Sequence, residues 1–252
     1  MRTKFAILLL LCGCAADVYA SPRIQHWQSP SGAQVYFVED HDLPMLDVAV
    51  DFAAGSGFDD AQKKGVAGLT NGLLNLGVEG MNEDDIARKL ADIGAQMGGH
   101  SDTDRSGLSL RTLSNAAERD VALDIMARAL QHPLFPDAVL AREKTRLISA
   151  LKEAETKPES IAGKAFGKAV FGAHPYGWAQ DVADVEKIQR ADLESFYRAH
   201  FGAAAAIVAL MGDITRAQAE QIAQQLTANL PVGGAPTHIA AVTESIPASE
   251  QR

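Results

Sequence analysis

The sequence predicts an α+β fold with a mixed, mostly antiparallel sheet and helices packed on one face. Strand-like segments near the N-terminus alternate apolar and polar residues, which is typical of strands with one buried face. Helix-like segments with an apolar repeat of about 3.6 residues occupy the middle of the chain. The order is strands, helices, a hairpin, more helices, then a strand and a helix, which favours α+β over a doubly wound parallel fold.

Six strands are expected from the apolar alternation and the turn residues around it. They cover residues 24–28, 34–39, 46–54, 96–102, 106–113 and 204–211. In the third segment Leu46, Val48 and Val50 alternate with more polar neighbours, which predicts a strand with one solvated face. The segment 204–211 is apolar throughout and is therefore expected inside the sheet.

Seven helices are expected from apolar periodicity and capping residues. They cover residues 64–76, 83–93, 117–131, 136–156, 159–171, 192–200 and 216–230. Asn82 suits an N-cap position, and Pro136 suits a first helical position. Pro158 is expected to end the long fourth helix, because proline cannot continue the hydrogen-bond pattern of the preceding turns.

Composition narrows the classes of function. The 252 residues are 47% hydrophobic and 22% charged, which is typical of a globular domain and not of a disordered chain. The formal net charge is -9, whereas nucleic-acid-binding domains present a basic face, so we expect no nucleic-acid partner.

The N-terminus, residues 1–20, has the features of a secretory signal peptide. Arg2 and Lys4 precede an apolar run, and Ala20 ends a small-residue cleavage site. The run is too short for a membrane span, which needs about 20 residues, so export to the periplasm or secretion is expected. The alternative interpretation is a lipoprotein whose Cys14 carries the lipid.

Both cysteines, Cys12 and Cys14, lie inside this leader. The remaining domain, expected over residues 21–230, therefore has no disulfide and no thiol chemistry. The tail, residues 231–252, is rich in Pro, Gly, Ala, Ser and Thr and is expected to be a linker.

Three stretches of the chain resemble one known family. They are "LDVAVDFAAGSGFDD" with "KKGVAGLTNGLLNLGVEG", then "IARKLADIGAQMGGHSDTDRSGLSLRTLS", and then "HPYGWAQDVADVEKIQRADLESFYRAHFGAAAAIVALMGDIT". Together they are similar to the N-terminal domain of a non-catalytic, zinc-free member of the pitrilysin/insulinase family of zinc metallopeptidases, the inverzincins. The resemblance implies a homologous C-terminal domain after Pro231, which we expect to be absent because the sequence ends at Arg252.

The resemblance also locates the family's zinc site. Active members carry H-x-x-E-H on a helix, where both histidines bind zinc and the glutamate acts as general base. Here Gly68 and Gly72 stand in place of the histidines, and Asn71 stands in place of the glutamate. The third ligand of the family belongs to a glutamate pair, whose positions are Ser149 and Ala150 in this chain. We therefore expect no zinc, no cofactor and no general base.

Two interpretations of the helix glycines remain open at this point. A site that lost its function has filled with small residues, or a bound peptide or neighbouring subunit approaches Gly68 and Gly72 closely.

The resemblance implies a function as well. In paired members of the family a zinc-free subunit faces a zinc-bearing homologous subunit around a chamber. We expect an exported, non-catalytic subunit that pairs with such a homologue and helps to bind peptide substrate. Strand addition would use the segment 96–102, with the candidate residues Gly98, Gly99, His100, Ser101 and Asp102.

Three alternatives compete with this expectation. The chain could be a stand-alone peptide-binding module or a truncated fragment without activity. It could also be an active peptidase that uses a cluster of His100, Asp102 and Asp104, which would share one face of a strand.

Overall fold

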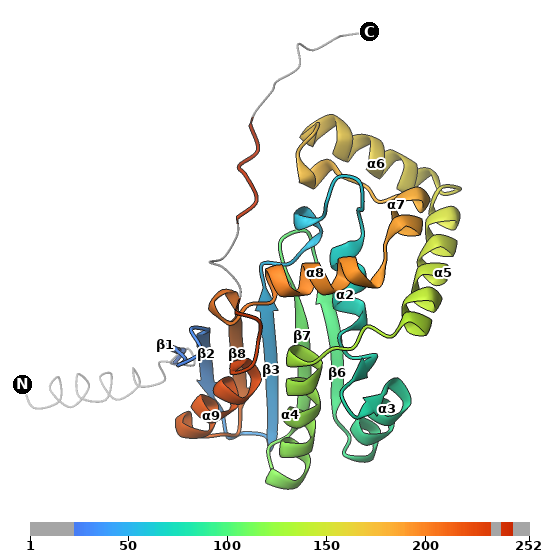
Figure 1. Ribbon diagram of the computed structural model, residues 1–252. Helices are drawn as coiled ribbons and strands as arrows, with labels where there is room; N and C mark the ends of the chain where they lie inside the picture. Colours follow the sequence, from blue (N-terminus) through green and yellow to red (C-terminus); the bar gives the residue numbers. More distant parts are fainter. Residues whose placement is uncertain (1–22, 233–237, 244–252) are drawn as a thin grey trace, which may run out of the picture.

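The computed structural model describes residues 23–232 and 238–243 of the chain (Figure 1). The expected signal peptide, with Cys12 and Cys14, lies outside these residues. Within them, no helix has both the length and the hydropathy that crossing a bilayer requires.

A six-stranded sheet forms the centre of the fold. Its strands are β1 (Gln25–Gln28), β2 (Gln34–Glu39), β3 (Met45–Phe52), β6 (Gln96–Ser101), β7 (Ser106–Leu113) and β8 (Ile207–Gly212). Their order across the sheet is β1-β2-β8-β3-β7-β6. Only β2 and β8 pair in parallel, and the other pairs are antiparallel. This arrangement confirms the predicted fold class, with β6 at one edge.

Helices of the described chain account for most of the remaining residues. They are α2 (Val66–Leu73), α3 (Glu83–Asp92), α4 (Ala116–Gln131), α5 (Asp137–Ala154), α6 (Pro158–Phe171), α7 (Val182–Lys187), α8 (Arg190–His200) and α9 (Arg216–Thr227). Short 3₁₀ turns cover Ser56–Phe58, Pro175–Gly177 and Ala203–Ala205, and β4 (Gly77–Val78) pairs with β5 (Met81–Asn82).

The helices α2, α4, α8 and α9 lie over the same face of the sheet (Figure 1). Val48, Val50 and Phe52 of β3 point to that face and are almost fully buried. The ring of Phe52 packs on Phe201 with 4.7 Å between the centroids, which joins the sheet to the end of α8. The opposite face carries the alternate residues of each strand and has no helix over it in the described part of the chain.

One strand prediction was wrong at its start, and two short elements were not predicted. The strand expected over residues 204–211 begins only at Ile207, because Ala203–Ala205 forms a 3₁₀ turn. The β4–β5 pair and α7 were not expected at all. They contain two and six residues, too few to show apolar periodicity, and α7 depends on the cap that Asp181 provides by accepting a hydrogen bond from the backbone of Asp184 (2.8 Å).

His41, in the loop between β2 and β3, ties that loop to the turn after β8. Its Nδ1 lies 2.6 Å from Asp213 Oδ1, and its Nε2 lies 3.1 Å from Glu39 Oε1. Hydrogen bonding to Asp213 and to Glu39 raises the pKa of His41 above 6.5. The same contact with His41, helped by the hydroxyl of Ser114, lowers the pKa of Asp213 below 3.8.

These shifts predict a small pH-dependent contribution to stability. It is complete where His41 and Asp213 are both charged, and it is lost as pH rises through the raised pKa of His41. It is also lost at low pH, as the pH falls through the lowered pKa of Asp213. Urea unfolding from about pH 5.5 to about pH 8.5 should show the difference between the wild type and His41→Asn shrinking as pH rises. A difference that grows with pH would contradict this account.

Candidate functional site

The positions of the family's zinc motif, Gly68, Asn71 and Gly72, all lie in the helix α2. The carboxylate of Asp59 accepts hydrogen bonds from the backbone N–H groups of Gly65 and Ala67, both at 2.7 Å. Gly65 adopts φ +106, a conformation that favours glycine. Burial raises the pKa of Asp59, while the two N–H groups stabilise its charged form. Sequence analysis missed this cap, because Asp59 precedes the helix by several residues.

A hollow of about 360 Å³ lies between α2 and α5. Gly68 and Gly72 of α2 and Ala150 of α5 form part of its wall. A Cβ atom added at either glycine would meet nothing within 4 Å. Within the described residues, therefore, no backbone approaches these glycines, and they leave open space beside the helix. The close approach considered above would have to come from another molecule.

The residues around the hollow do not fit a zinc ion. Gly68, Gly72 and Ala150 have no ligating atom, and Ser149 donates its hydroxyl to the carbonyl of Thr145 in its own helix (3.0 Å). Zinc sites in proteins use three or four side-chain nitrogen, sulfur or carboxylate ligands. Within the described residues no three His, Cys, Asp or Glu side chains converge well enough to hold a metal.

An ion pair between Glu143 and Arg146 lies beside the hollow and was not predicted from the sequence. Glu143 and Arg146 lie one turn apart on α5 and both line it, with 3.4 Å between Arg146 Nη1 and Glu143 Oε2. Arg142 Nε also donates to Glu143, at 3.1 Å. This carboxylate is therefore engaged with two guanidinium groups, which makes it a poor free base or metal ligand. The signal that could have found this pair is the spacing of three residues between opposite charges on the predicted helix.

Asn71 links α2 to the edge strand β6. Its Nδ2 donates to the carbonyl of His100 at 2.9 Å, and its side chain is 3% exposed. Gly99 lies against it, since a Cβ added there would be 2.9 Å from Asn71 Nδ2. The residue in place of the family's general base therefore positions the edge strand in this chain. An amide has no useful basicity, so Asn71 cannot deprotonate water.

The five residues singled out for peptide binding lie along this edge. Gly98, Gly99, His100 and Ser101 belong to β6, while Asp102 follows in the hairpin turn. The outer edge of β6 has no neighbouring strand in the described part of the chain. Its outward backbone groups have no strand partner among the described residues. Asp102 has a different role, because its carboxylate accepts hydrogen bonds from the backbone of Asp104 (2.8 Å) and Arg105 (2.7 Å) and shapes the turn.

The cluster of His100, Asp102 and Asp104 does not form. His100 Nε2 shares a hydrogen bond of 2.5 Å with Asp51 Oδ1, which lies across the strand β7. The strand between them carries Gly107 at that register, so no side chain blocks the contact. Asp104 instead accepts a hydrogen bond from the hydroxyl of Tyr176 at 2.6 Å. Three separate engagements leave no shared site for a metal or a nucleophile.

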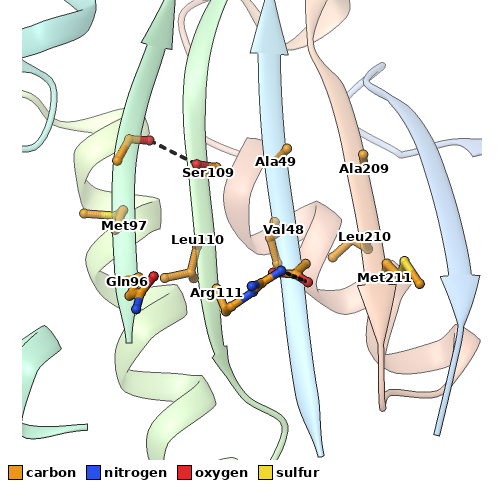
Figure 2. A pocket seen from close by; sticks show the side chains of 12 residues that line it. Val48, Ala49, Gln96, Met97, Ser109, Leu110, Arg111, Ala209, Leu210 and Met211 are labelled. Carbon is orange, nitrogen blue, oxygen red and sulfur yellow. Dashed lines mark hydrogen bonds and ion pairs between the residues drawn. The ribbon is translucent and has the colours of Figure 1, made fainter. Parts of the chain in front are cut away.

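The face of the sheet opposite the helices carries a groove of about 580 Å³, shown in Figure 2. Its floor is a row of small residues from four adjacent strands: Gly98, Ser109, Ala49 and Ala209. On one side, Arg111 donates two hydrogen bonds to Asp47, at 2.6 and 2.9 Å, and this contact raises the pKa of Arg111. Met211 lines the same groove and is 46% exposed.

The open space beside Gly68 and Gly72 predicts how alanine at either position changes the free energy of unfolding. Gly68→Ala and Gly72→Ala should each raise the free energy of unfolding by about 0.5–1 kcal/mol, because alanine is the better helix former and the added methyl meets no atom. Gly99→Ala is the matched control and should lower it, since its methyl would displace Asn71 from the His100 carbonyl. Urea unfolding of the three variants measures both effects. Destabilisation by both α2 variants would show that the space is not open.

Comparisons with known proteins identify the family and agree with the fold described above. A family model described as insulinase, peptidase family M16, matches residues 34–179, and one described as peptidase M16 inactive domain matches residues 187–252. The crystal structure of a peptidase M16 inactive domain from Pseudomonas fluorescens superposes with a TM-score of 0.85 and 36% identity, over 88% of this chain and 54% of that one.

Two curated relatives extend the comparison. A probable mitochondrial-processing peptidase subunit beta of Arabidopsis thaliana is 21% identical over 83% of this chain and 39% of its own length. The non-peptidase homolog YmxG of Helicobacter pylori is 25% identical over 84% of this chain and 49% of its own length. The chain thus spans half or less of the length of these two relatives.

Proposed function

Because the chain belongs to the insulinase family, peptidase family M16, we propose that it is an exported, non-catalytic member that binds peptides and works beside a zinc-bearing homologous subunit. The hollow beside α2 carries this proposal. The helix, its cap and the facing α5 are all formed there, yet the residues at Gly68, Asn71, Gly72 and Ala150 supply neither metal ligands nor a base. A relative named a non-peptidase homolog and the match to an inactive-domain model support the same conclusion.

Peptide binding is assigned to the outer edge of β6. An extended peptide would add as a further strand and pair with the unpaired backbone groups of that edge. Asn71 supports this role, because its hydrogen bond to the His100 carbonyl holds the strand against α2. The glycines Gly98 and Gly99 leave the strand with little side-chain bulk beside an incoming peptide.

Backbone methylation of the ligand tests strand addition. A peptide strand pairs through the N–H groups of alternate residues, so N-methylating that set should abolish binding. N-methylating the other alternate set leaves those bonds intact and should preserve binding, which makes it a matched control. Fluorescence anisotropy with the two labelled peptides and the full chain compares them. Equal binding of both peptides would contradict strand addition.

Pairing with a homologous subunit is assigned to the sheet face opposite the helices, which carries the groove of Figure 2. A relative is named a subunit of a mitochondrial-processing peptidase, which supports a role inside an assembly. The groove of Figure 2 offers a small-residue floor, and the exposed Met211 beside it offers apolar contact area. Size-exclusion chromatography with the zinc-bearing homologue encoded in the same genome tests this pairing. A shared peak supports it, and separate elution at micromolar concentration would favour the stand-alone peptide-binding module.

Export rests on the sequence of residues 1–20. N-terminal sequencing of protein recovered from the periplasm or the medium should begin at Ser21. Labelling by radioactive palmitate would instead support the lipoprotein interpretation, in which Cys14 is the first residue.

A further inference from the structure

A short segment near the C-terminus starts beside the end of the sheet where β3 ends and β8 begins (Figure 1). This segment, His238–Thr243, has no regular secondary structure, and we call it the strap. Two contacts hold it. The imidazole of His174 donates to the carbonyl of Ala240 (2.7 Å), and Ile239 packs directly on Gly57. Ile239 is half-buried, while the other strap residues are exposed.

The strap borders a cavity of about 440 Å³, which is separate from the hollow beside α2 and from the groove of Figure 2. Apolar side chains form much of its lining: Phe52, Phe58, Ala204, Ala206, Ile207 and Ile239. Polar residues line it as well: Gln34, Asp51, Asp104, Arg105, Tyr176 and His238. The Tyr176 hydroxyl donates a hydrogen bond to Asp104. A cleft of this size that combines apolar lining with several polar side chains is typical of a ligand site.

We infer that this cavity binds a large apolar side chain of an extended peptide, and that the strap covers it until such a peptide arrives. The strap is itself an extended segment with one apolar side chain turned inward and the next carbonyl bound by His174. It therefore displays the mode of recognition that a peptide from another molecule would use. Ile239 leaves most of the cavity unfilled, so a phenylalanine or leucine at that position of a ligand would bury more apolar area.

The way the strap is held makes exchange feasible. Two contacts and five exposed residues are a small attachment compared with the buried core of the sheet. The site is separate from the outer edge of β6, since its walls come from β3, the turn before β8 and the hairpin turn. A peptide bound along β6 would therefore gain a second contact with the protein at this cavity.

The test uses the full chain and a labelled peptide of sequence His-Phe-Ala-Ala-Val-Thr, which is the strap with phenylalanine in place of isoleucine. Ile239→Asp releases the strap, so this variant should bind the peptide at least about tenfold more tightly than the wild type. Adding His174→Ala to Ile239→Asp should return the affinity toward the wild-type value, because the carbonyl contact is lost. Thermal unfolding should be the same in all three chains, since neither residue belongs to the core.

A second peptide, His-Asp-Ala-Ala-Val-Thr, is the matched control and should not bind any of these chains. Fluorescence anisotropy gives each affinity. Equal affinity of the two peptides for Ile239→Asp would overturn the assignment of the cavity to an apolar side chain. Equal affinity of the wild type and Ile239→Asp for the phenylalanine peptide would overturn the role of the strap.

Discussion

Replacing Gly68 and Gly72 by histidine and Ala150 by glutamate is expected to create a zinc site in this chain. Residues four apart on a helix share a face, so two imidazoles on α2 would project together. The hollow gives them room, because no atom lies within 4 Å of a Cβ at either glycine. Ala150 lines the same hollow from α5, so a glutamate there can supply the third ligand.

The expected effect is large and easily measured. A zinc concentration about a hundredfold above the dissociation constant should raise the free energy of unfolding of the Gly68→His, Gly72→His, Ala150→Glu variant by about 2.7 kcal/mol. The wild type should show no such gain. Thermal unfolding with and without zinc, followed by zinc analysis after dialysis, measures both.

A matched control separates a true three-ligand site from a pair of exposed histidines. Gly163 and Gly167 have the same spacing on α6 and also face open space, but they do not line the hollow opposite α5. Gly163→His with Gly167→His should therefore bind zinc more weakly than the triple variant. Equal zinc stabilisation of the two proteins would mean that α5 does not face α2 as described.

Asn71→Asp is expected to lower the free energy of unfolding by about 3 kcal/mol at neutral pH. The change replaces the N–H donor to the His100 carbonyl with a carboxylate oxygen, in a place where the side chain is 3% exposed. It therefore removes a hydrogen bond, places two acceptors together and buries a charge. The same variant should bind peptide more weakly, because β6 loses its attachment to α2.

The pH dependence of this variant identifies the cause. A protonated aspartate has an O–H group and can again donate to the His100 carbonyl, so stability should recover as pH falls through the pKa of the new carboxyl. Urea unfolding at about pH 7 and about pH 4 compares the two states.

Thr70→Val is the neighbouring control for this experiment. The hydroxyl of Thr70 is buried and has no hydrogen-bond partner among the described residues. Its removal should leave stability unchanged or higher at both pH values. If Asn71→Asp lowers the free energy of unfolding equally at both pH values, Asn71 does not act as the donor to the His100 carbonyl.

Local sequence signals predicted a good part of the fold. The strands 34–39 and 106–113 have the expected bounds. The first is a short run rich in Val, Tyr and Phe, and in the second Leu108 and Leu110 alternate with polar residues. The helix after Asn82 begins where expected, because Asn82 and Asp85 form a capping box. The family resemblance, carried by long motifs, indicated the overall architecture correctly.

The contacts that define the site could not be predicted in this way. Whether Gly68 faces open space depends on α5, which lies about 75 residues further along the chain. The bond from Asn71 to His100 joins segments 29 residues apart, and no periodicity signals it. The groove of Figure 2 needs the order of four strands, of which only β6 and β7 are consecutive in sequence. Such features follow from tertiary packing and not from local propensity.

We expect this member of the family to bind peptide without cleaving it. The most direct test is the zinc content of the purified chain after dialysis, measured on the same sample as peptide cleavage and peptide binding. We expect no stoichiometric zinc and no cleavage, with peptide binding retained. One tightly bound zinc per chain together with chelator-sensitive cleavage would contradict this expectation.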